Sequence, residues 1–190
     1  MKSTASLLIT GGNTGVGLEI FQHFQPKSKS ISFSTGFDIR LPEIRTQIAE
    51  MSLDYDIFFN HAYCLDHSQA LLFEEVYQLW RKENKSGHIF TTGTYGTYAA
   101  GGIDPQYIAL KSELDELHKK FVQQLKYEKL KFNITLLRLG MLDTERSRQK
   151  PHWPGHGVRG QDIVKLVEFI YTLPKHLLID DVVCESKAEA

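Results

Sequence analysis

A tyrosine and a lysine four residues apart, Tyr107 and Lys111, are the residues whose types and spacing point most directly to chemistry. Four residues are just over one helical turn, so both side chains project from the same face of a helix. The lysine charge favours the phenolate and would lower the pKa of the tyrosine. Such a tyrosine can give a proton to a carbonyl or take one from an alcohol while hydride moves. Taken alone, the spacing is common and favours a core tyrosine beside a lysine that reaches solvent.

A glycine-rich segment lies near the N-terminus, directly after an apolar strand candidate and directly before a helix candidate. Glycine permits a tight turn and the close approach of backbone to a phosphate. The start of a helix offers free N–H groups and a partial positive charge to an anion. In this context the segment predicts a dinucleotide-binding loop rather than a plain turn. It reads Thr10-Gly11-Gly12-Asn13-Thr14-Gly15-Val16-Gly17.

Strand-like and helical segments alternate along the chain, and they must position these two groups. The strand candidates are Ser6–Thr10, Ser30–Ser34, Asp56–Asn60, His88–Thr92, Asn133–Leu139 and Leu177–Cys184. The helix candidates are Gly15–Phe24, Pro42–Met51, Ser68–Lys85, Pro105–Lys129 and Gly160–Leu173. Several strand candidates are apolar on both faces, as buried parallel strands are. We therefore predict an α/β fold, a doubly wound parallel sheet of about six strands with helices on both faces, in one domain over residues 1–190.

The spacing of Gly11, Gly15 and Gly17 gives T-G-x-x-x-G-x-G, which resembles the short-chain dehydrogenase/reductase family. The Y-x-x-x-K pair follows in that family's order, in a chain that would be an unusually short member. The resemblance implies a Rossmann-type fold and an NAD(P)-dependent oxidoreductase that interconverts a carbonyl and an alcohol. It implies that Tyr107 is the general acid/base, and that Lys111 lowers its pKa and holds the nicotinamide ribose.

The family's catalytic serine stands thirteen residues before the tyrosine, where this chain has Thr94. A threonine carries the same hydroxyl and can hold a substrate oxygen by hydrogen bonding, although its methyl group narrows the site. Thr92 could fill the role instead if the loop is shifted. The resemblance therefore gives a catalytic set of Thr94, Tyr107 and Lys111.

Three further segments resemble family motifs that contact the cofactor. Asn60-His61-Ala62-Tyr63 resembles N-N-A-G, whose asparagine braces the central strands and whose alanine lets the adenosine side pack closely. Asp38-Ile39 resembles the acidic motif that contacts adenine, although Asp38 could equally cap a helix beginning near Pro42. After the fifth strand, backbone at Leu142 and the Thr144 hydroxyl match positions that hold the carboxamide. The implied cofactor-binding set is Gly11, Asn13, Thr14, Gly15, Val16, Gly17, Ser34, Asp38, Ile39, Asn60, His61, Ala62, Tyr107, Lys111, Leu142 and Thr144.

The chain also departs from the family pattern. It is short between Ser30 and Asp38, where the usual helix is lost, and between Ala62 and Ser68. The family's proton relay uses an asparagine in the following helix, but none lies between Ala62 and Trp80. By position, Asp66, His67 or Ser68 could replace it, or the relay could be absent.

The end of the second strand usually selects the cofactor, because an acidic residue there bonds the ribose 2′-hydroxyl of NAD. Here Ser34-Thr35-Gly36 follows the strand, and Arg40 comes somewhat later. No carboxylate stands at the strand end, so the sequence leans toward NADP over NAD.

Composition limits the other function classes. The formal net charge of −1 gives no field that would attract nucleic acid or an anionic membrane. Two distant cysteines, Cys64 and Cys184, form no zinc spacing or disulfide framework, which fits a cytoplasmic protein. No stretch predicts a signal peptide or a membrane span. His152 and His156 are separated by Pro154 and Gly155, so we assign no metal.

Two other functions stay open at this stage. An NAD(P)-binding sensor or scaffold with little or no turnover would fit the missing asparagine, the serine-to-threonine change, the shortened loops and Leu139, which stands where the family has a proline. A nucleotide-sugar epimerase or dehydratase is a weaker alternative, since such relatives carry a longer C-terminal substrate region. The family resemblance implies a homodimer or homotetramer that pairs through the helices predicted over Ser68–Lys85 and Pro105–Lys129. The substrate would be a small carbonyl or alcohol.

Overall fold

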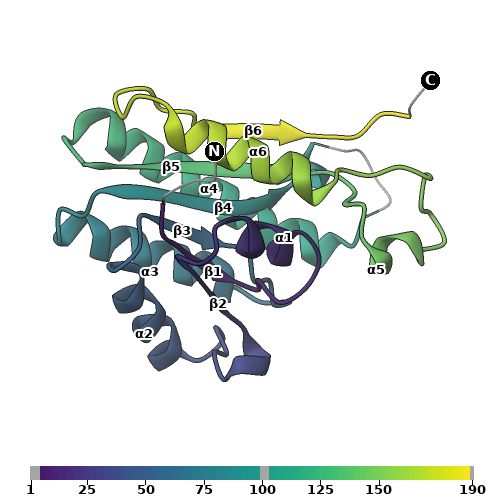
Figure 1. Ribbon diagram of the computed structural model, residues 1–190, viewed down its shortest axis with the longest axis horizontal. Helices are drawn as coiled ribbons and strands as arrows, with labels where there is room; N and C mark the ends of the chain where they lie inside the picture. The colour runs from purple at the N-terminus through teal and green to yellow at the C-terminus, as the bar shows by residue number, and fades with distance from the viewer. Residues whose placement is uncertain (1–4, 99–102, 189–190) are drawn as a thin grey trace.

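A computed structural model of the chain, which describes residues 5–98 and 103–188, contains one six-stranded parallel sheet (Figure 1). Its strand order is β2-β1-β3-β4-β5-β6, and each adjacent pair is parallel. The predicted doubly wound α/β fold is therefore confirmed. The strands are β1 (Leu7–Thr10), β2 (Ser28–Ile31), β3 (Ile57–Asn60), β4 (Gly87–Thr94), β5 (Phe132–Leu139) and β6 (Asp181–Cys184).

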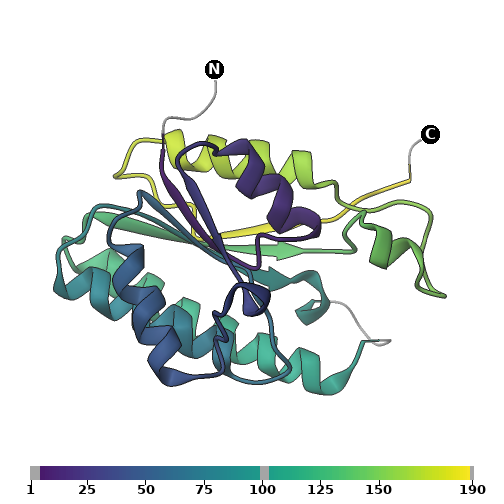
Figure 2. The ribbon, with the colours of Figure 1, turned by 60° about the horizontal axis from the view of Figure 1, so that its bottom comes forward.

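Helices cover both faces of the sheet, as Figure 2 shows. The helices are α1 (Gly15–His23), α2 (Pro42–Ser52), α3 (Ser68–Lys82), α4 (Pro105–Tyr127), α5 (Glu145–Arg148) and α6 (Gly160–Thr172). Two of them, α1 and α6, pack side by side on one face, while α2, α3 and α4 cover the other. Each face has its own apolar core, because the strands between them are apolar on both sides.

The long helix α4 has clear causes in the sequence. Asp104 caps its N-terminus by accepting a 2.9 Å hydrogen bond from the Gln106 N–H, and Pro105 occupies the first turn. Leu114 and Phe121, spaced at helical intervals, are buried against the sheet. This anchoring fixes the start of α4, which carries the tyrosine and the lysine.

The predicted bounds need correction at two strands. The segment predicted as the strand Ser30–Ser34 leaves the sheet after Ile31, and Phe33–Thr35 form a 3₁₀ turn. Hydrogen bonds between Ser32 and Thr35 close this turn. The strand predicted from Leu177 begins only at Asp181, because the carbonyl of Leu177 accepts a hydrogen bond from the Asn133 side chain instead of a strand partner.

The ends of the strands determine where a ligand can bind. The strand order reverses between β1, whose sequence successor β2 lies on one side, and β3, which lies on the other. In such sheets ligands bind outside the carboxyl ends of the strands at this reversal point. The glycine-rich loop follows β1 and the loop at Asn60–Tyr63 follows β3, so both lie there.

No helix in the described part of the chain has the length and apolar character needed to cross a membrane.

Candidate functional site

The glycine-rich loop has the shape of an anion-binding turn. Gly11 and Gly15 have positive φ angles of 74° and 54°, which side chains rarely adopt. Helix α1 begins after Thr14 without a side-chain cap, so its first N–H groups face the loop mouth. Its first turn contains no acidic residue. The loop therefore offers a positive backbone dipole to an anion.

The loop after β3 packs tightly against the glycine-rich loop. A side chain at Gly17 would collide with the carbonyl of Gly11 and lie 2.9 Å from the His61 ring. Thr10 ties the two loops together, because its Oγ1 accepts hydrogen bonds from the N–H groups of His61 and Ala62 at 2.9 and 3.0 Å. The predicted cofactor-binding set omits Thr10, although the motif T-G-x-x-x-G-x-G begins with it.

A group of small polar side chains joins the glycine-rich loop to the end of β2. Asn13 accepts a 2.7 Å hydrogen bond from Ser30, and donates to Ser32 and Ser34 at 2.6 and 3.0 Å. We call Asn13, Ser30, Ser32 and Ser34 the Asn13 cluster. It is solvent-exposed and carries no charge. Ser34 therefore lies beside the loop, as the cofactor-binding set requires.

Asp38 was predicted either to contact the adenine or to cap the following helix, and the structure excludes the second interpretation. The residue that caps α2 is Leu41, so Asp38 is not the helix cap. Its carboxylate instead pairs with the Arg40 guanidinium at 2.7 and 2.8 Å, and this hydrogen bonding lowers the pKa of Asp38. Ile39 is buried in the core, so only its backbone can face a ligand.

Tyr107 and Thr94 meet where β4 ends and α4 begins. Thr94 is the last residue of β4 and lies beside Leu139 of β5. Burial raises the pKa of Tyr107, while a hydrogen bond with the Thr94 side chain lowers it. Thr92 has a different partner, since its Oγ1 lies 2.9 Å from His61 Nδ1. Of the two candidate threonines, Thr94 is the one placed with the tyrosine.

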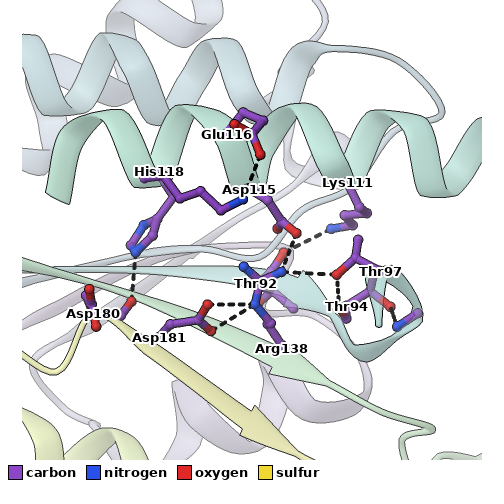
Figure 3. A network of polar contacts seen from close by, with 12 residues as sticks. Thr92, Thr94, Thr97, Lys111, Asp115, Glu116, His118, Arg138, Asp180 and Asp181 are labelled. Atoms are coloured by element: carbon purple, nitrogen blue, oxygen red, sulfur yellow. Dashed lines mark hydrogen bonds and ion pairs between the residues drawn. The ribbon is translucent and has the colours of Figure 1, made fainter. Parts of the chain in front are cut away.

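Lys111 lies one turn beyond Tyr107, but its ammonium faces the interior. Nζ donates to the Gln69 Oε1 at 2.7 Å and to the Thr92 carbonyl at 2.9 Å (Figure 3 shows the second contact). The side chain is only 3% exposed, and burial lowers the pKa of Lys111 to about 7. The expected lowering of the Tyr107 pKa by this lysine is not found here, because the pKa of Tyr107 lies above its usual value.

Gln69, in the first turn of α3, is a buried polar residue that no sequence motif had singled out. Besides accepting from Lys111, it donates to the carbonyls of Asn60 and Thr92 at 3.2 and 3.1 Å. It therefore braces β3 against β4, the role expected of Asn60. The Asn60 amide instead donates to the Gln69 carbonyl at 3.0 Å, linking β3 to α3. Asp66, His67 and Ser68 were the predicted substitutes for the asparagine, and Gln69, the next residue in the chain, was not among them.

The three residues proposed as substitutes for that asparagine lie elsewhere. Asp66 accepts a hydrogen bond from the Ser68 N–H at 2.9 Å at the start of α3. His67 pairs with Glu113 at 2.5 Å on the exposed surface. These contacts hold the helix start in place, and no contact between these residues and Lys111 is found in the described structure.

A buried ionic group lies near Thr94 and Lys111, as Figure 3 shows. The Arg138 guanidinium pairs with Asp115, with Asp181 at 2.8 and 2.9 Å, and with the Thr97 hydroxyl at 3.1 Å. Thr97 in turn donates to the Thr94 carbonyl at 3.1 Å. We call Thr97, Asp115, Arg138 and Asp181 the Arg138 cluster. The hydrogen bond from Thr97 to the Thr94 carbonyl ties this cluster to the end of β4. A charged residue within a strand is the only sign of the cluster in the sequence.

The segment after β5 returns to the glycine-rich loop. Leu142 forms a parallel bridge with Val158, which folds the following loop back. Thr144 caps the short helix α5 by accepting from the Ser147 N–H at 3.2 Å, and its methyl group lies beside Gly15. Thr144, one of the two predicted carboxamide positions, thus lies near the start of α1, while Leu142 pairs with Val158. No group of three or more histidine, cysteine or acidic side chains in the described residues could hold a metal ion.

No protein-family model and no curated protein sequence matches the chain. Solved structures do resemble it. Serine dehydrogenase from Escherichia coli superposes with a TM-score of 0.72 at 14% identity, over 95% of this chain and 97% of that one. A Thermococcus sibiricus alcohol dehydrogenase, complexed with 5-hydroxy-NADP, gives 0.72 at 13% identity, over 97% and 99%. A 7α-hydroxysteroid dehydrogenase, complexed with NADH and 7-oxo glycochenodeoxycholic acid, gives 0.75 at 13% identity, over 94% and 92%.

In each comparison the similarity extends over nearly the whole length of both chains. At 13–14% sequence identity it shows a common fold and nothing more. The similarity is one of fold, and it agrees with the six-stranded parallel sheet and its flanking helices. The chain has the fold of the short-chain dehydrogenases/reductases.

Proposed function

We propose that this protein is an NAD(P)-dependent oxidoreductase of the short-chain type that interconverts a carbonyl and an alcohol. The observation that carries this proposal is the meeting of Tyr107 with Thr94 at the carboxyl end of β4, with Lys111 one turn beyond. Such sheet ends are where this class of fold binds its ligands.

The residues present fit a nicotinamide dinucleotide. The uncapped start of α1 and the bare backbone at Gly15 suit a pyrophosphate. The Asn13 cluster offers exposed hydroxyl groups where the adenosine ribose would lie. No carboxylate belongs to that cluster, which supports a lean toward NADP, while NAD stays the alternative. When bound, the cofactor would supply or accept the hydride.

The side chains of the chain itself would then handle the proton. Thr94 would orient the substrate oxygen through its hydroxyl, and Tyr107 would give or take the proton at that oxygen. Lys111 would hold the nicotinamide ribose. Gln69 would fix the Lys111 ammonium from the side away from the substrate. The substrate is a small molecule with a carbonyl or hydroxyl group.

A titration with NADPH and NADH, followed by nicotinamide fluorescence and thermal shift, tests the binding part of this proposal. We expect saturable binding of at least one nucleotide below millimolar concentration. A panel of carbonyl compounds then tests turnover. The substitution Tyr107→Phe should reduce turnover by a factor of about 10² or more and leave nucleotide affinity nearly the same. Binding of neither nucleotide would contradict the proposal, and unchanged turnover in Tyr107→Phe would contradict the role of the tyrosine.

A sensor or scaffold that binds NAD(P) without turnover is the second candidate. It is favoured by Lys111, whose ammonium already has two interior partners and is almost inaccessible. Nucleotide binding with no activity across the panel would support it over the enzyme.

We further propose that residues 1–190 form one NAD(P)-binding domain that assembles as a homodimer or homotetramer through α3 and α4. A groove of about 310 Å³ lies between these helices and exposes Leu71, and its charged lining residues are Glu74, Glu113, Glu116 and Lys120. Cys64 and Cys184 are free thiols, which supports a cytoplasmic location.

A further inference from the structure

The Lys111 ammonium is enclosed from two sides. It carries three hydrogen-bond donors, and two of them bond Gln69 and the Thr92 carbonyl in the interior. On the other side lie two aromatic rings, with their centroids 4.8 Å (Tyr63) and 5.8 Å (Tyr107) from Nζ. These distances are within the range of a cation–π attraction. The nearer ring belongs to a residue with no role in the chemistry proposed above.

Tyr63 extends from the glycine-rich loop to the catalytic pair. It follows Ala62, whose backbone lies 3.2 Å from the position that a side chain at Gly11 would occupy. Its ring packs edge-on against Tyr107, with the two centroids 5.1 Å apart. The motif that this segment resembles has glycine at the same position, so the ring is an addition of this chain. It occupies the approach from the loop to Lys111.

The hydroxyl of Tyr63 is buried without a hydrogen-bond partner in the described structure. A buried hydroxyl without a partner is unfavourable, because it has lost its hydrogen bonds to water and has gained none within the protein. Rotation of the ring toward solvent would restore those hydrogen bonds and expose the lysine. The closed position is therefore held mainly by packing of the Tyr63 ring against Tyr107 and Lys111, and it can be displaced.

We propose that Tyr63 is a positioning residue that covers Lys111 in the free protein and must rotate away before the lysine contacts the hydroxyl groups of a bound ribose. The proposal deepens the proposed function and rests on it for the identity of the ligand. A ligand with adjacent hydroxyl groups can replace the contact between the ring and the charge, while a ligand without them cannot. The cover would thus couple exposure of the lysine to the arrival of the nucleotide.

Acylation of lysines by a small amine-reactive ester at pH 8, read by peptide mass spectrometry, measures this cover directly. Lys165, on α6 and 77% exposed, is the internal reference. We expect Lys111 of the wild-type protein to react at least about tenfold more slowly than Lys165, because access requires local opening. Since the pKa of Lys111 is already lowered to about 7, protonation cannot account for slow labelling at pH 8.

Two substitutions separate the ring from the hydroxyl. In Tyr63→Ala the rate at Lys111 should rise about tenfold, to a value close to that of Lys165. In Tyr63→Phe the ring remains and only the unpaired hydroxyl is lost, so the rate at Lys111 should be equal to or lower than that of the wild type. Rapid labelling of Lys111 in the wild type, or no increase in Tyr63→Ala, would overturn the proposal. The wild-type comparison holds even if Tyr63→Ala proves unstable.

Added NADPH or NADH separates this proposal from the proposed function. In Tyr63→Ala, nucleotide should slow the labelling of Lys111 and leave that of Lys165 unchanged. If Tyr63→Ala labels faster but neither nucleotide protects Lys111, the cover stands and the ribose contact of the proposed function fails. If nucleotide binds wild type and Tyr63→Ala with equal affinity, the requirement for displacement is overturned.

Discussion

Two polar clusters, on opposite sides of the central strands, hold the candidate site, and they differ in burial and in charge. The Asn13 cluster joins the glycine-rich loop to the end of β2 through hydroxyl and amide groups that face solvent. The Arg138 cluster joins β5, β6 and α4 through charges, and its guanidinium side chain is only 3% exposed. One cluster is neutral and open, while the other is ionic and closed.

This difference bears on what each cluster can do. Exposed neutral groups exchange one hydrogen-bond partner for water or a ligand at little cost in free energy. Buried charges cannot, because removing a partner leaves a charge without compensation in a medium of low dielectric constant. We infer that the Asn13 cluster can adapt to a ligand, whereas the Arg138 cluster fixes the frame on which Thr94 and Lys111 are mounted.

The largest effect is expected from breaking the closed cluster. Arg138→Met would leave the Asp115 carboxylate buried without its cation, and burial already raises the pKa of that carboxyl against the influence of Arg138. The free energy of unfolding should fall by about 3–5 kcal/mol, as measured by urea denaturation. Arg40→Met is the matched control, because Arg40 pairs with Asp38 at the exposed surface and should leave the unfolding midpoint unchanged. Equal effects of the two substitutions would remove the distinction between the clusters.

A smaller effect, on the pH dependence of the free energy of unfolding, is expected from His118, a buried histidine beside the Arg138 cluster. His118 is buried on α4, and its Nε2–H donates to the Asp180 carbonyl at 2.7 Å (Figure 3). Burial lowers the pKa of His118 to about 4, below the value of about 6.5 in an unfolded chain. Between these values the unfolded chain binds a proton that the folded chain rejects. The free energy of unfolding should therefore fall by about 1.4 kcal/mol for each pH unit from about 6.5 down to about 4.

His118→Gln isolates this contribution from those of the other buried histidines. Urea denaturation at pH 7, 6 and 5 should give the variant a shallower loss of stability than the wild type. The difference in slope should approach 1.4 kcal/mol per pH unit at the lower end of that range. Identical slopes would mean that His118 accepts a proton in the folded protein, and that the closed side of the molecule is open to water.

The fold could be predicted from the sequence to a large extent, because its signals are repeated and local. Buried parallel strands leave apolar runs, and α4 leaves a stripe that includes Leu114 and Phe121. The second strand was predicted to extend to Ser34, but it ends at Ile31. Ser32 and Ser34 instead accept hydrogen bonds from Asn13, a residue distant in sequence. Short elements that depend on such contacts leave no periodic signal.

The candidate site was predicted less completely. Tyr107 and Lys111 lie one turn apart on α4, as their spacing indicated, and Thr94, which the family resemblance pointed to, lies beside Tyr107 at the end of β4. Their catalytic roles stay predictions. Gln69 was missed because its partners, Lys111 and the Thr92 carbonyl, lie on other elements and nothing in its neighbourhood marks it. The Arg138 cluster was missed for the same reason, as its ion pairs span 23 and 43 residues of sequence.

The smallest effect on stability is expected from the open cluster, where the effect on binding should exceed it. Asn13→Ala removes hydrogen bonds to Ser30, Ser32 and Ser34, all solvent-exposed, so the free energy of unfolding should change by no more than about 0.5 kcal/mol. The glycine-rich loop would lose its tie to β2 and would have to be ordered when the nucleotide binds. Affinity for NADPH should fall about tenfold, measured by nicotinamide fluorescence, because ordering costs about 1.4 kcal/mol for a loop of this kind. A loss of stability comparable to that of Arg138→Met, with affinity unchanged, would show that the open cluster also belongs to the frame.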